Sequence, residues 1–224
     1  AVLAACDLPP ARWSAADGSR LKAGSVAGTI SGGLRQILRA ERPMLNLLQR
    51  ACGIATVTRA MADALVGTHC RVLHTRKTTP GLRLFEVVAV MAGGGHLHRI
   101  DLTDTVMVKD NHWQALRASG LSLRDALAAA GSERYVEVET LIQLDEACAA
   151  GATRLLIDNQ SPDTVREWAT RARTLRPGIE IEATGGITPA TARAYADAGA
   201  DFVSAGFLTH SVAAADLGLE ISTL

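Results

Sequence analysis

From residue 71 onward, short apolar runs alternate with longer segments rich in Ala, Leu, Arg and Glu. The runs occupy residues 71–74, 105–108, 135–138, 154–157, 180–183 and 202–204. Short β-branched runs are typical of strands, and the segments between them are long enough for helices. The alternation therefore predicts an α/β fold of parallel β/α units. An open doubly wound sheet and an incomplete barrel both fit this pattern, since ligands bind at the carboxyl ends of the strands in either.

Two helix starts can be read from local sequence. Ser161-Pro162 and Thr188-Pro189 each place a capping hydroxyl before a proline, which is the preferred chemistry of a first helical turn. Gly151 is placed to end the helix before the fourth run. These signals support helices between the predicted strands.

The first part of the chain has a different character. Within residues 1–42, glycines such as Gly18, Gly24 and Gly28 punctuate short segments, which is typical of turns joining short strands. From residue 44 to about residue 66, apolar residues recur at helical spacing and predict a long, largely buried helix.

Composition limits the classes of partner. Lys plus Arg and Asp plus Glu both number 23, so the formal net charge is zero and no overall field attracts nucleic acid or an anionic membrane. No apolar run approaches the ~18 residues that span a bilayer. The four cysteines are scattered without metal-ligand spacing, which favours a reduced, cytoplasmic protein. Any anion site must therefore be built locally.

Residues 75–83 contain the strongest local feature, the adjacent cations Arg76 and Lys77 after a predicted strand. Arg offers a rigid fork for carboxylate or phosphate and Lys a compact charge, so the pair suits a ligand with several anionic groups. An isolated pair would more simply be a solvated basic turn. Here three glycines at residues 93–95 and then His98-Arg99 follow beside other predicted elements, which favours a binding site.

Taken together, these motifs resemble the quinolinate phosphoribosyltransferase family. The likeness runs in order through residues 41–46, 75–82, 92–99, 108–112, 136–138, 157–159, 182–186 and 208–211. It implies an incomplete parallel α/β barrel at residues 43–211, preceded by part of an N-terminal α/β sandwich domain at residues 1–42. Residues 212–224 are expected to pack back on the sandwich, and the chain is expected to lack the first part of that domain.

The resemblance implies an enzyme of de novo NAD biosynthesis. It would transfer the phosphoribosyl group of phosphoribosyl pyrophosphate to quinolinate and release CO₂, giving nicotinate mononucleotide and pyrophosphate. The transition state is expected to resemble an oxocarbenium ion, so positioning and electrostatics should dominate catalysis. Mg²⁺ held through pyrophosphate is the implied cofactor. A homodimer or larger homo-oligomer with shared active sites is the implied assembly.

Four residues match the family positions that hold quinolinate: Arg42, Arg76, His98 and Arg99. Taken alone, His98 could be a satisfied structural histidine. Its neighbour Arg99 and the three preceding glycines, which let backbone approach a ligand closely, favour a functional role. Arg42 precedes the long helical stretch, whereas the others follow predicted strands. The resemblance implies that Arg42 enters the site of the partner subunit.

Four further residues match positions near the phosphoribosyl donor: Lys77, Lys109, Glu137 and Asp158. Lys77, Glu137 and Asp158 are the expected catalytic residues, and the two acids are the expected metal contacts. Glu137 lies between two valines, so one face of its strand is apolar and the other acidic, unlike an ordinary core strand. Asp158 ends an apolar run and could equally cap the next helix.

Two glycine turns follow the last two predicted strands. Glycines beside a helix N-terminus expose N–H groups that bind anions, and phosphate sites are common after the late strands of an α/β barrel. Both turns match the family, which implies a 5-phosphate site. The expected contacts are Thr184, Gly185, Gly186, Ser204 and Gly206, with His210 near the donor.

Three residues depart from the family pattern. His74 replaces a common aspartate, Met91 a basic residue and Leu97 an asparagine. Leu97 leaves the orientation of the adjacent His98 open. His74 is expected to be structural or exposed, and His112 could serve to fix the loop after Lys109.

Two other functions are compatible with this pattern. One is a related phosphoribosyltransferase of another substrate, of the type associated with molybdate transport; residues 109–112 favour the quinolinate enzyme instead. The other is a non-catalytic anion-binding homologue. The joint presence of Arg42, Lys77, Glu137 and Asp158 argues against it.

Overall fold

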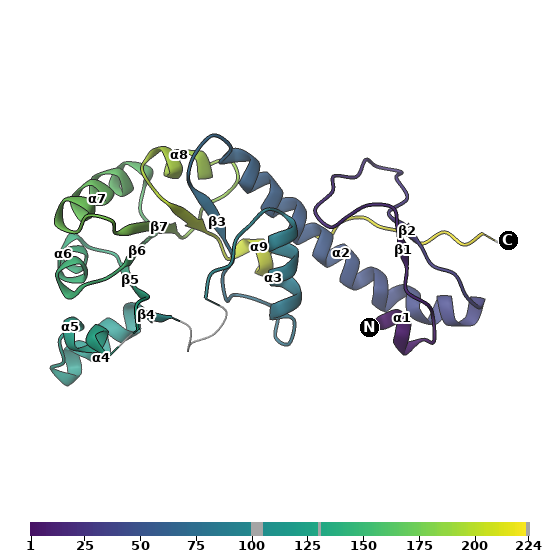
Figure 1. Ribbon diagram of the computed structural model, residues 1–224, viewed down its shortest axis with the longest axis horizontal. Helices are drawn as coiled ribbons and strands as arrows, with labels where there is room; N and C mark the ends of the chain where they lie inside the picture. The colour runs from purple at the N-terminus through teal and green to yellow at the C-terminus, as the bar shows by residue number, and fades with distance from the viewer. Residues whose placement is uncertain (100–104, 130, 223–224) are drawn as a thin grey trace.

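The computed structural model describes residues 1–99, 105–129 and 131–222, and Figure 1 shows two parts joined by one long helix. Within these residues, six parallel strands form the main sheet in the order β3-β8-β7-β6-β5-β4. Their bounds are β3 Arg71–Leu73, β4 Val106–Val108, β5 Arg134–Val138, β6 Arg154–Asp158, β7 Glu180–Thr184 and β8 Phe202–Ser204. The six strands predicted from the sequence are thus confirmed.

The sheet curves into an incomplete barrel with helices on its outer side (Figure 1). These helices are α3 Arg83–Ala92, α4 Asp110–Ser119, α5 Leu123–Ala128, α6 Leu141–Ala150, α7 Pro162–Leu175, α8 Ala192–Asp197 and α9 Phe207–His210. A parallel bridge joins Leu73 of β3 to His96. The opening of the barrel therefore lies between this segment and β4. Because the sheet curves and these helices lie on its outer side, the architecture is an incomplete barrel and not the open doubly wound sheet that the sequence pattern also allowed.

The outer side of the sheet is apolar, whereas the inner side carries acidic side chains beside a small apolar cluster of Met107, Tyr135 and Leu156. Val136, Val138 and Ile181 are buried in the main hydrophobic core between sheet and helices. Because successive side chains along a strand point to opposite faces, Glu137 and Glu182 face the barrel interior. The acidic alternation predicted for one strand is therefore confirmed and recurs in β7.

Helix α2, Leu34–Ala64, is 31 residues long and contains Pro43. The predicted helix start at residue 44 was wrong, because α2 already begins at Leu34. A proline inside a helix normally removes a backbone hydrogen bond and tends to end the helix. Here Ile37 and Ala40 pack against Cys6 and Leu8, and this cluster stabilises the turns that precede the proline. The predicted domain boundary between residues 42 and 43 falls inside α2 and stays a prediction.

The N-terminal part is small. It comprises α1 Val2–Ala5 and an antiparallel pair, β1 Arg12–Trp13 and β2 Gly28–Thr29. The segment after α9 runs along α2 towards this pair (Figure 1). The Ala215 N–H donates to the carbonyl of Gln49 at 2.9 Å, and Gln49 Nε2 donates to the Leu217 carbonyl at 2.8 Å. In the described parts of the chain, no helix is long and apolar enough to cross a membrane.

One of the two predicted helix starts holds. Ser161 caps α7 and accepts a hydrogen bond from the Thr164 N–H. The second was wrong by several residues, because α8 begins at Ala192 with Thr191 as its N-cap. Thr188 instead donates its N–H to Thr191 Oγ1 at 3.0 Å and forms a turn before the helix.

Candidate active site

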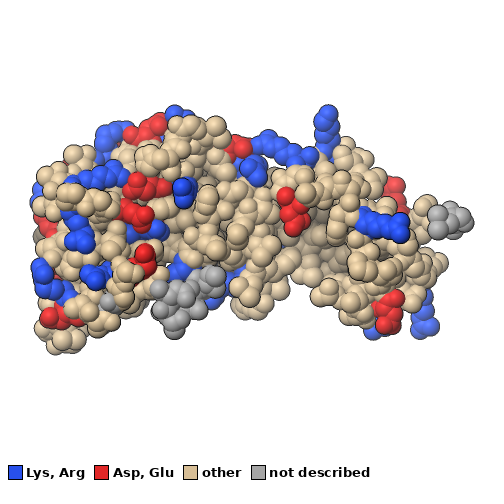
Figure 2. All heavy atoms as spheres, in the orientation of Figure 1, with Lys and Arg blue, Asp and Glu red and all other residues tan. Residues whose placement is uncertain are grey.

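The carboxyl ends of the strands bring most of the predicted site residues to one end of the barrel. Lys77 follows β3, Lys109 follows β4, Asp158 ends β6, and Ser204 ends β8. Because the six strands are parallel, these ends share one rim, the usual position of the active site in α/β barrels. On the face drawn in Figure 2, basic and acidic side chains are interspersed, in keeping with zero net charge. The site is therefore a local arrangement of charge.

Glu137 and Lys109 form an ion pair at this rim. Glu137 is buried on the inner face of β5, and its carbonyl accepts a hydrogen bond from Trp113 Nε1 at 2.9 Å. His112 Nδ1 accepts the backbone N–H of Lys109 at 3.1 Å. The structural interpretation of His112 is confirmed, since this imidazole fixes the turn that presents Lys109.

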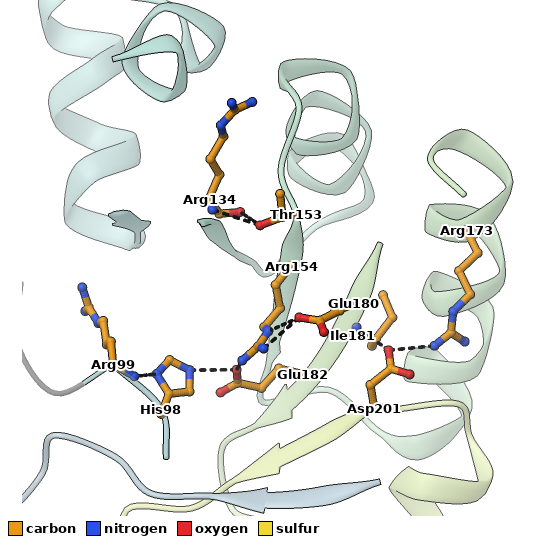
Figure 3. A network of polar contacts seen from close by, with 10 residues as sticks. All are labelled: His98, Arg99, Arg134, Thr153, Arg154, Arg173, Glu180, Ile181, Glu182 and Asp201. Carbon is orange, nitrogen blue, oxygen red and sulfur yellow. Dashed lines mark hydrogen bonds and ion pairs between the residues drawn. The ribbon is translucent and has the colours of Figure 1, made fainter. Parts of the chain in front are cut away.

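His98 is held between two hydrogen bonds. Its Nδ1 accepts the Arg99 N–H at 2.8 Å, and its Nε2 lies 3.0 Å from Glu182 Oε2 (Figure 3). A ring nitrogen that accepts an N–H carries no proton, so Nε2 is the donor to Glu182. Glu182 therefore fixes the imidazole that the replacement at Leu97 left without an evident partner.

Glu182 also belongs to a charged network that crosses the barrel interior (Figure 3). Arg154 Nη1 lies 3.4 Å from Glu182 Oε2, and Arg154 Nη2 lies 2.8 Å from Glu180 Oε2. Burial acts to raise the pKa of Glu182, but the hydrogen bonds of His98 and Ser204 and the charge of Arg154 outweigh it and keep that pKa lowered. The carboxylate stays charged in the barrel interior.

Sequence reasoning did not single out Glu182 as a site residue. The signal was present, because Glu182 lies between Ile181 and Ala183, the same alternation that drew attention to Glu137. An acid between two core-facing residues on a strand must face the barrel interior. Applied to every strand, this argument would have found it.

Arg76 and Arg99 bring two like charges near enough to interact. Burial and the like charge of Arg76 lower the pKa of Arg99, while Glu137 and Glu182 oppose this shift. The buried Nε of Arg76 has no hydrogen-bond partner among the residues that the structure describes. Neighbouring, partly desolvated cations favour an anionic ligand that can bridge them.

Asp158 ends β6 and does not cap the following helix. Its Oδ2 accepts a hydrogen bond from Asn159 Nδ2 at 2.7 Å, whereas Ser161 provides the cap of α7. Glu137 pairs with Leu156 in the strand register, so Asp158, two residues further along β6, faces the same inner side. The capping alternative was wrong.

No group of three or more His, Cys, Asp or Glu that could hold a metal ion occurs in residues 1–99, 105–129 and 131–222. Glu137 and Asp158, the two carboxylates expected to contact a metal, therefore do not belong to a larger group of this kind. Mg²⁺ is typically held by one or two carboxylates together with substrate phosphates and water. This pair fits a metal that arrives with a phosphate ligand.

The two glycine turns adjoin other site residues. Gly185 has φ 86° and a Cβ there would lie 2.2 Å from Asn159 Oδ1. A Cβ on Gly206 would lie 2.7 Å from Lys77 Cδ and 2.9 Å from His210 Cδ2, so Gly206 lets these two side chains approach each other.

The helix argument for a phosphate site at these turns was wrong in part. Gly186 is separated from the first residue of α8, Ala192, by a further turn. Helix α9, which follows Gly206, has only four residues. Any anion contact at these turns must therefore come from local N–H groups and side chains, because so short a helix has little dipole.

Arg42 is not brought together with the other predicted residues within one chain. It lies in the first half of α2, and the N-terminal end of that helix points away from the barrel (Figure 1). Its side chain is 70% exposed, and its nearest carboxylate oxygen, Glu41 Oε1, is 4.0 Å away.

Comparison with known families matches both parts of the chain. Residues 54–220 match the quinolinate phosphoribosyl transferase C-terminal domain, and residues 1–52 match the corresponding N-terminal domain. A probable nicotinate-nucleotide pyrophosphorylase (carboxylating) of Bacillus subtilis is 43% identical over 92% of this chain and 71% of its own length. The nicotinate-nucleotide pyrophosphorylase (carboxylating) of Mycobacterium leprae is 42% identical over 92% of this chain and 72% of its own.

Solved structures agree with the sequence relatives. The nicotinate-nucleotide pyrophosphorylase of Ehrlichia chaffeensis superimposes with a TM-score of 0.88 at 28% identity, covering 99% of this chain and 80% of that one. The enzyme of the same name from Francisella tularensis gives a TM-score of 0.84 at 32% identity, covering 96% and 76%.

Proposed function

The chain belongs to the quinolinate phosphoribosyl transferase family, and we propose that the rim of its barrel binds quinolinate beside the phosphoribosyl donor. Its activity is that of a nicotinate-nucleotide pyrophosphorylase (carboxylating), a phosphoribosyltransferase of NAD biosynthesis. The two substrates are quinolinate and phosphoribosyl pyrophosphate. The assignment of roles to residues is supported by the charges at the rim.

The observation that carries the proposal is the buried Nε of Arg76, which has no partner among the described residues, beside the like charge that Arg76 exerts on Arg99. Quinolinate has two carboxylates on adjacent ring carbons, and two guanidinium forks match a dianion of this kind. His98, which Glu182 fixes through a hydrogen bond, would present its imidazole to the same ligand. Binding of the dianion would relieve the repulsion between the two arginines.

Lys77, Lys109, Glu137 and Asp158 are assigned to the donor. The two ammonium groups would neutralise the departing pyrophosphate, and the two carboxylates would face the ribose, where positive charge develops. When bound with pyrophosphate, Mg²⁺ would add charge neutralisation on the leaving group. Glu137 and Asp158 are the residues that would hold it.

The 5-phosphate is assigned to the two glycine turns. Thr184 ends β7 and is followed by Gly185 and Gly186, and Ser204 ends β8 with Gly206 two residues further on. Gly206 lies against Lys77 and His210, so a phosphate there would also meet a cation. This arrangement would place the ribose C1′ over the centre of the rim.

Arg42 is assigned to the site of a second subunit. Its exposed position away from the rim leaves its side chain accessible to a second subunit. A homodimer in which α2 of one subunit reaches the barrel of the other would complete the quinolinate site. The site would then be shared.

A product assay tests the proposal. Purified protein with quinolinate, phosphoribosyl pyrophosphate and Mg²⁺ should form nicotinate mononucleotide, pyrophosphate and CO₂ in equal amounts. Nicotinate, which has one carboxylate fewer, is the control acceptor and should give no product. Turnover of nicotinate but not quinolinate would contradict the proposed dianion site.

A further inference from the structure

The loop that carries Arg76 and Lys77 rests on a buried ion pair outside the proposed site. Arg50 of α2 donates through Nε to Glu86 Oε1 of α3 at 2.6 Å. The Glu86 side chain is completely buried and that of Arg50 is 29% exposed. A buried carboxylate destabilises the fold unless it is paired, so the partners of Glu86 are held in fixed positions.

Both members of this pair hold the loop through Thr79. Glu86 Oε2 accepts the Thr79 N–H at 3.1 Å, and Arg50 Nη2 donates to Thr79 Oγ1 at 2.9 Å. These bonds fix the loop two residues after Lys77, where it turns towards α3.

A third residue holds the loop from the other side. Arg50 Nη2 also donates to the Thr209 carbonyl at 2.6 Å. The hydroxyl of Thr209, which is 1% exposed, donates to the Lys77 carbonyl at 2.8 Å. Arg50 thus joins the loop to α9, and Thr209 holds the backbone of Lys77 itself.

We infer that Arg50, Glu86 and Thr209 are positioning residues that fix the backbone of Lys77 for the reaction. The inference rests on the role proposed above for Lys77. The Arg50–Glu86 pair anchors the loop to α2 and α3, and the Thr209 hydroxyl fixes the position of the Lys77 backbone beside Gly206. Arg50 and Glu86 act through the loop, whereas Thr209 Oγ1 also lies 3.2 Å from the Gly206 carbonyl and so joins the loop to the glycine turn after β8.

The sharpest variant is Thr209→Val, which removes the hydroxyl and keeps the branched shape. Loss of one hydrogen bond to the Lys77 carbonyl should lower kcat/KM for phosphoribosyl pyrophosphate about tenfold. Thr209→Ser keeps the hydroxyl and should retain activity within about twofold. Glu86→Gln should lower kcat/KM by at least the same factor as Thr209→Val.

Thr58→Val is the matched control. Thr58 is a buried threonine of α2 whose hydroxyl has no partner within the described residues. Its replacement should leave kcat/KM unchanged. If Thr58→Val lowered activity as much as Thr209→Val, the effect would be one of core packing and the inference would be overturned.

Limited trypsin digestion gives a readout that does not depend on catalysis. Trypsin cleaves after Arg76 and Lys77, so new N-termini at Lys77 and Thr78 report loop release. Thr209→Val and Glu86→Gln should accelerate this cleavage about tenfold relative to wild type and Thr58→Val. Unchanged cleavage in both variants would overturn the inference, as would faster cleavage with unchanged kcat/KM. If Lys77→Ala kept full activity, the proposed role of Lys77 would fail. Digestion of the Thr209→Val and Glu86→Gln variants would still show whether Arg50, Glu86 and Thr209 hold the loop.

Discussion

His98 Nε2 lies 3.0 Å from Glu182 Oε2, and the exposed fractions of the two side chains are only 7% and 1%. Arg154 approaches the same carboxylate oxygen at 3.4 Å. Glu182 therefore connects the imidazole of His98, a proposed substrate-binding group, to the guanidinium of Arg154 in the barrel interior. Removing it would leave a buried cation and a buried imidazole without their partner.

Glu182→Ala is expected to lower the free energy of unfolding by about 3–5 kcal/mol, because it breaks a buried charge network from one side. Urea unfolding would measure the loss. Glu180→Ala is the matched control, since Glu180 pairs with the same Arg154 but is 45% exposed. The control should cost about 1 kcal/mol or less. Equal losses in unfolding free energy in the two variants would contradict the expectation that the buried position of Glu182 makes its ion pairs more important for stability.

His74 is expected to make stability dependent on pH. Burial lowers its pKa, the Thr75 and His98 backbone groups oppose this, and the charge of Arg83 adds to the lowering. As pH falls below the ordinary value of 6.5, the unfolded chain binds a proton that folded His74 does not, so stability falls. Above that value this contribution is fully present.

The measurement is the urea midpoint as a function of pH from about 7.5 to about 5. His74→Gln should give a flatter curve than wild type in the acidic part of this range. The same substitution at His96, whose side chain is exposed, is the control. An equally steep curve in His74→Gln would show that another group is responsible.

The alternating strands and helices could be predicted from the sequence, because the strands are short β-branched runs and some helices carry local capping signals, whereas the barrel was implied only by the family resemblance. Glu137 was found from the alternation of side chains along its strand, and Glu182 could have been. Helix α2 could not be bounded correctly, because its first turns depend on contacts of Ile37 and Ala40 with Cys6 and Leu8. Tertiary packing there outweighs the local effect of Pro43.

Individual roles at the site were harder to predict than its location. The sequence left Asp158 with two interpretations, and only the cap provided by Ser161 excluded one of them. The sequence predicted that His74 is either structural or exposed, and in the structure its side chain is buried, as a structural residue would be. The dependence of Lys77 on Arg50 and Thr209 joins residues 27 and 132 positions from it along the chain. No local pattern contains such contacts.

A shared active site predicts complementation between two inactive variants. Arg42→Ala and Lys77→Ala should each abolish turnover, because each removes a cation from every site of its own homodimer. A mixed dimer has one site with both defects and one with neither. Random exchange, with about half the dimers mixed, should return roughly a quarter of wild-type activity.

The measurement is the activity of the mixture after subunit exchange, and exchange is monitored with a mass-tagged subunit. Mixing Lys77→Ala with Glu137→Ala is the control, because both defects lie at the same barrel rim. With those defects in different subunits, neither site of a mixed dimer is intact, so no activity should return. No recovery in the first mixture would place Arg42 outside the partner's site.

The central claim is that the cations at the barrel rim perform the chemistry, and the chain offers a direct test. It contains three lysines, Lys22, Lys77 and Lys109, and the first is an exposed residue of the N-terminal part. The decisive measurement is kcat/KM for nicotinate mononucleotide formation in Lys77→Ala beside Lys22→Ala. We expect a loss of about a hundredfold or more in Lys77→Ala, equivalent to about 2–4 kcal/mol of transition-state stabilisation, with unchanged unfolding and an unaffected control. Activity of Lys77→Ala equal to that of Lys22→Ala would contradict the account.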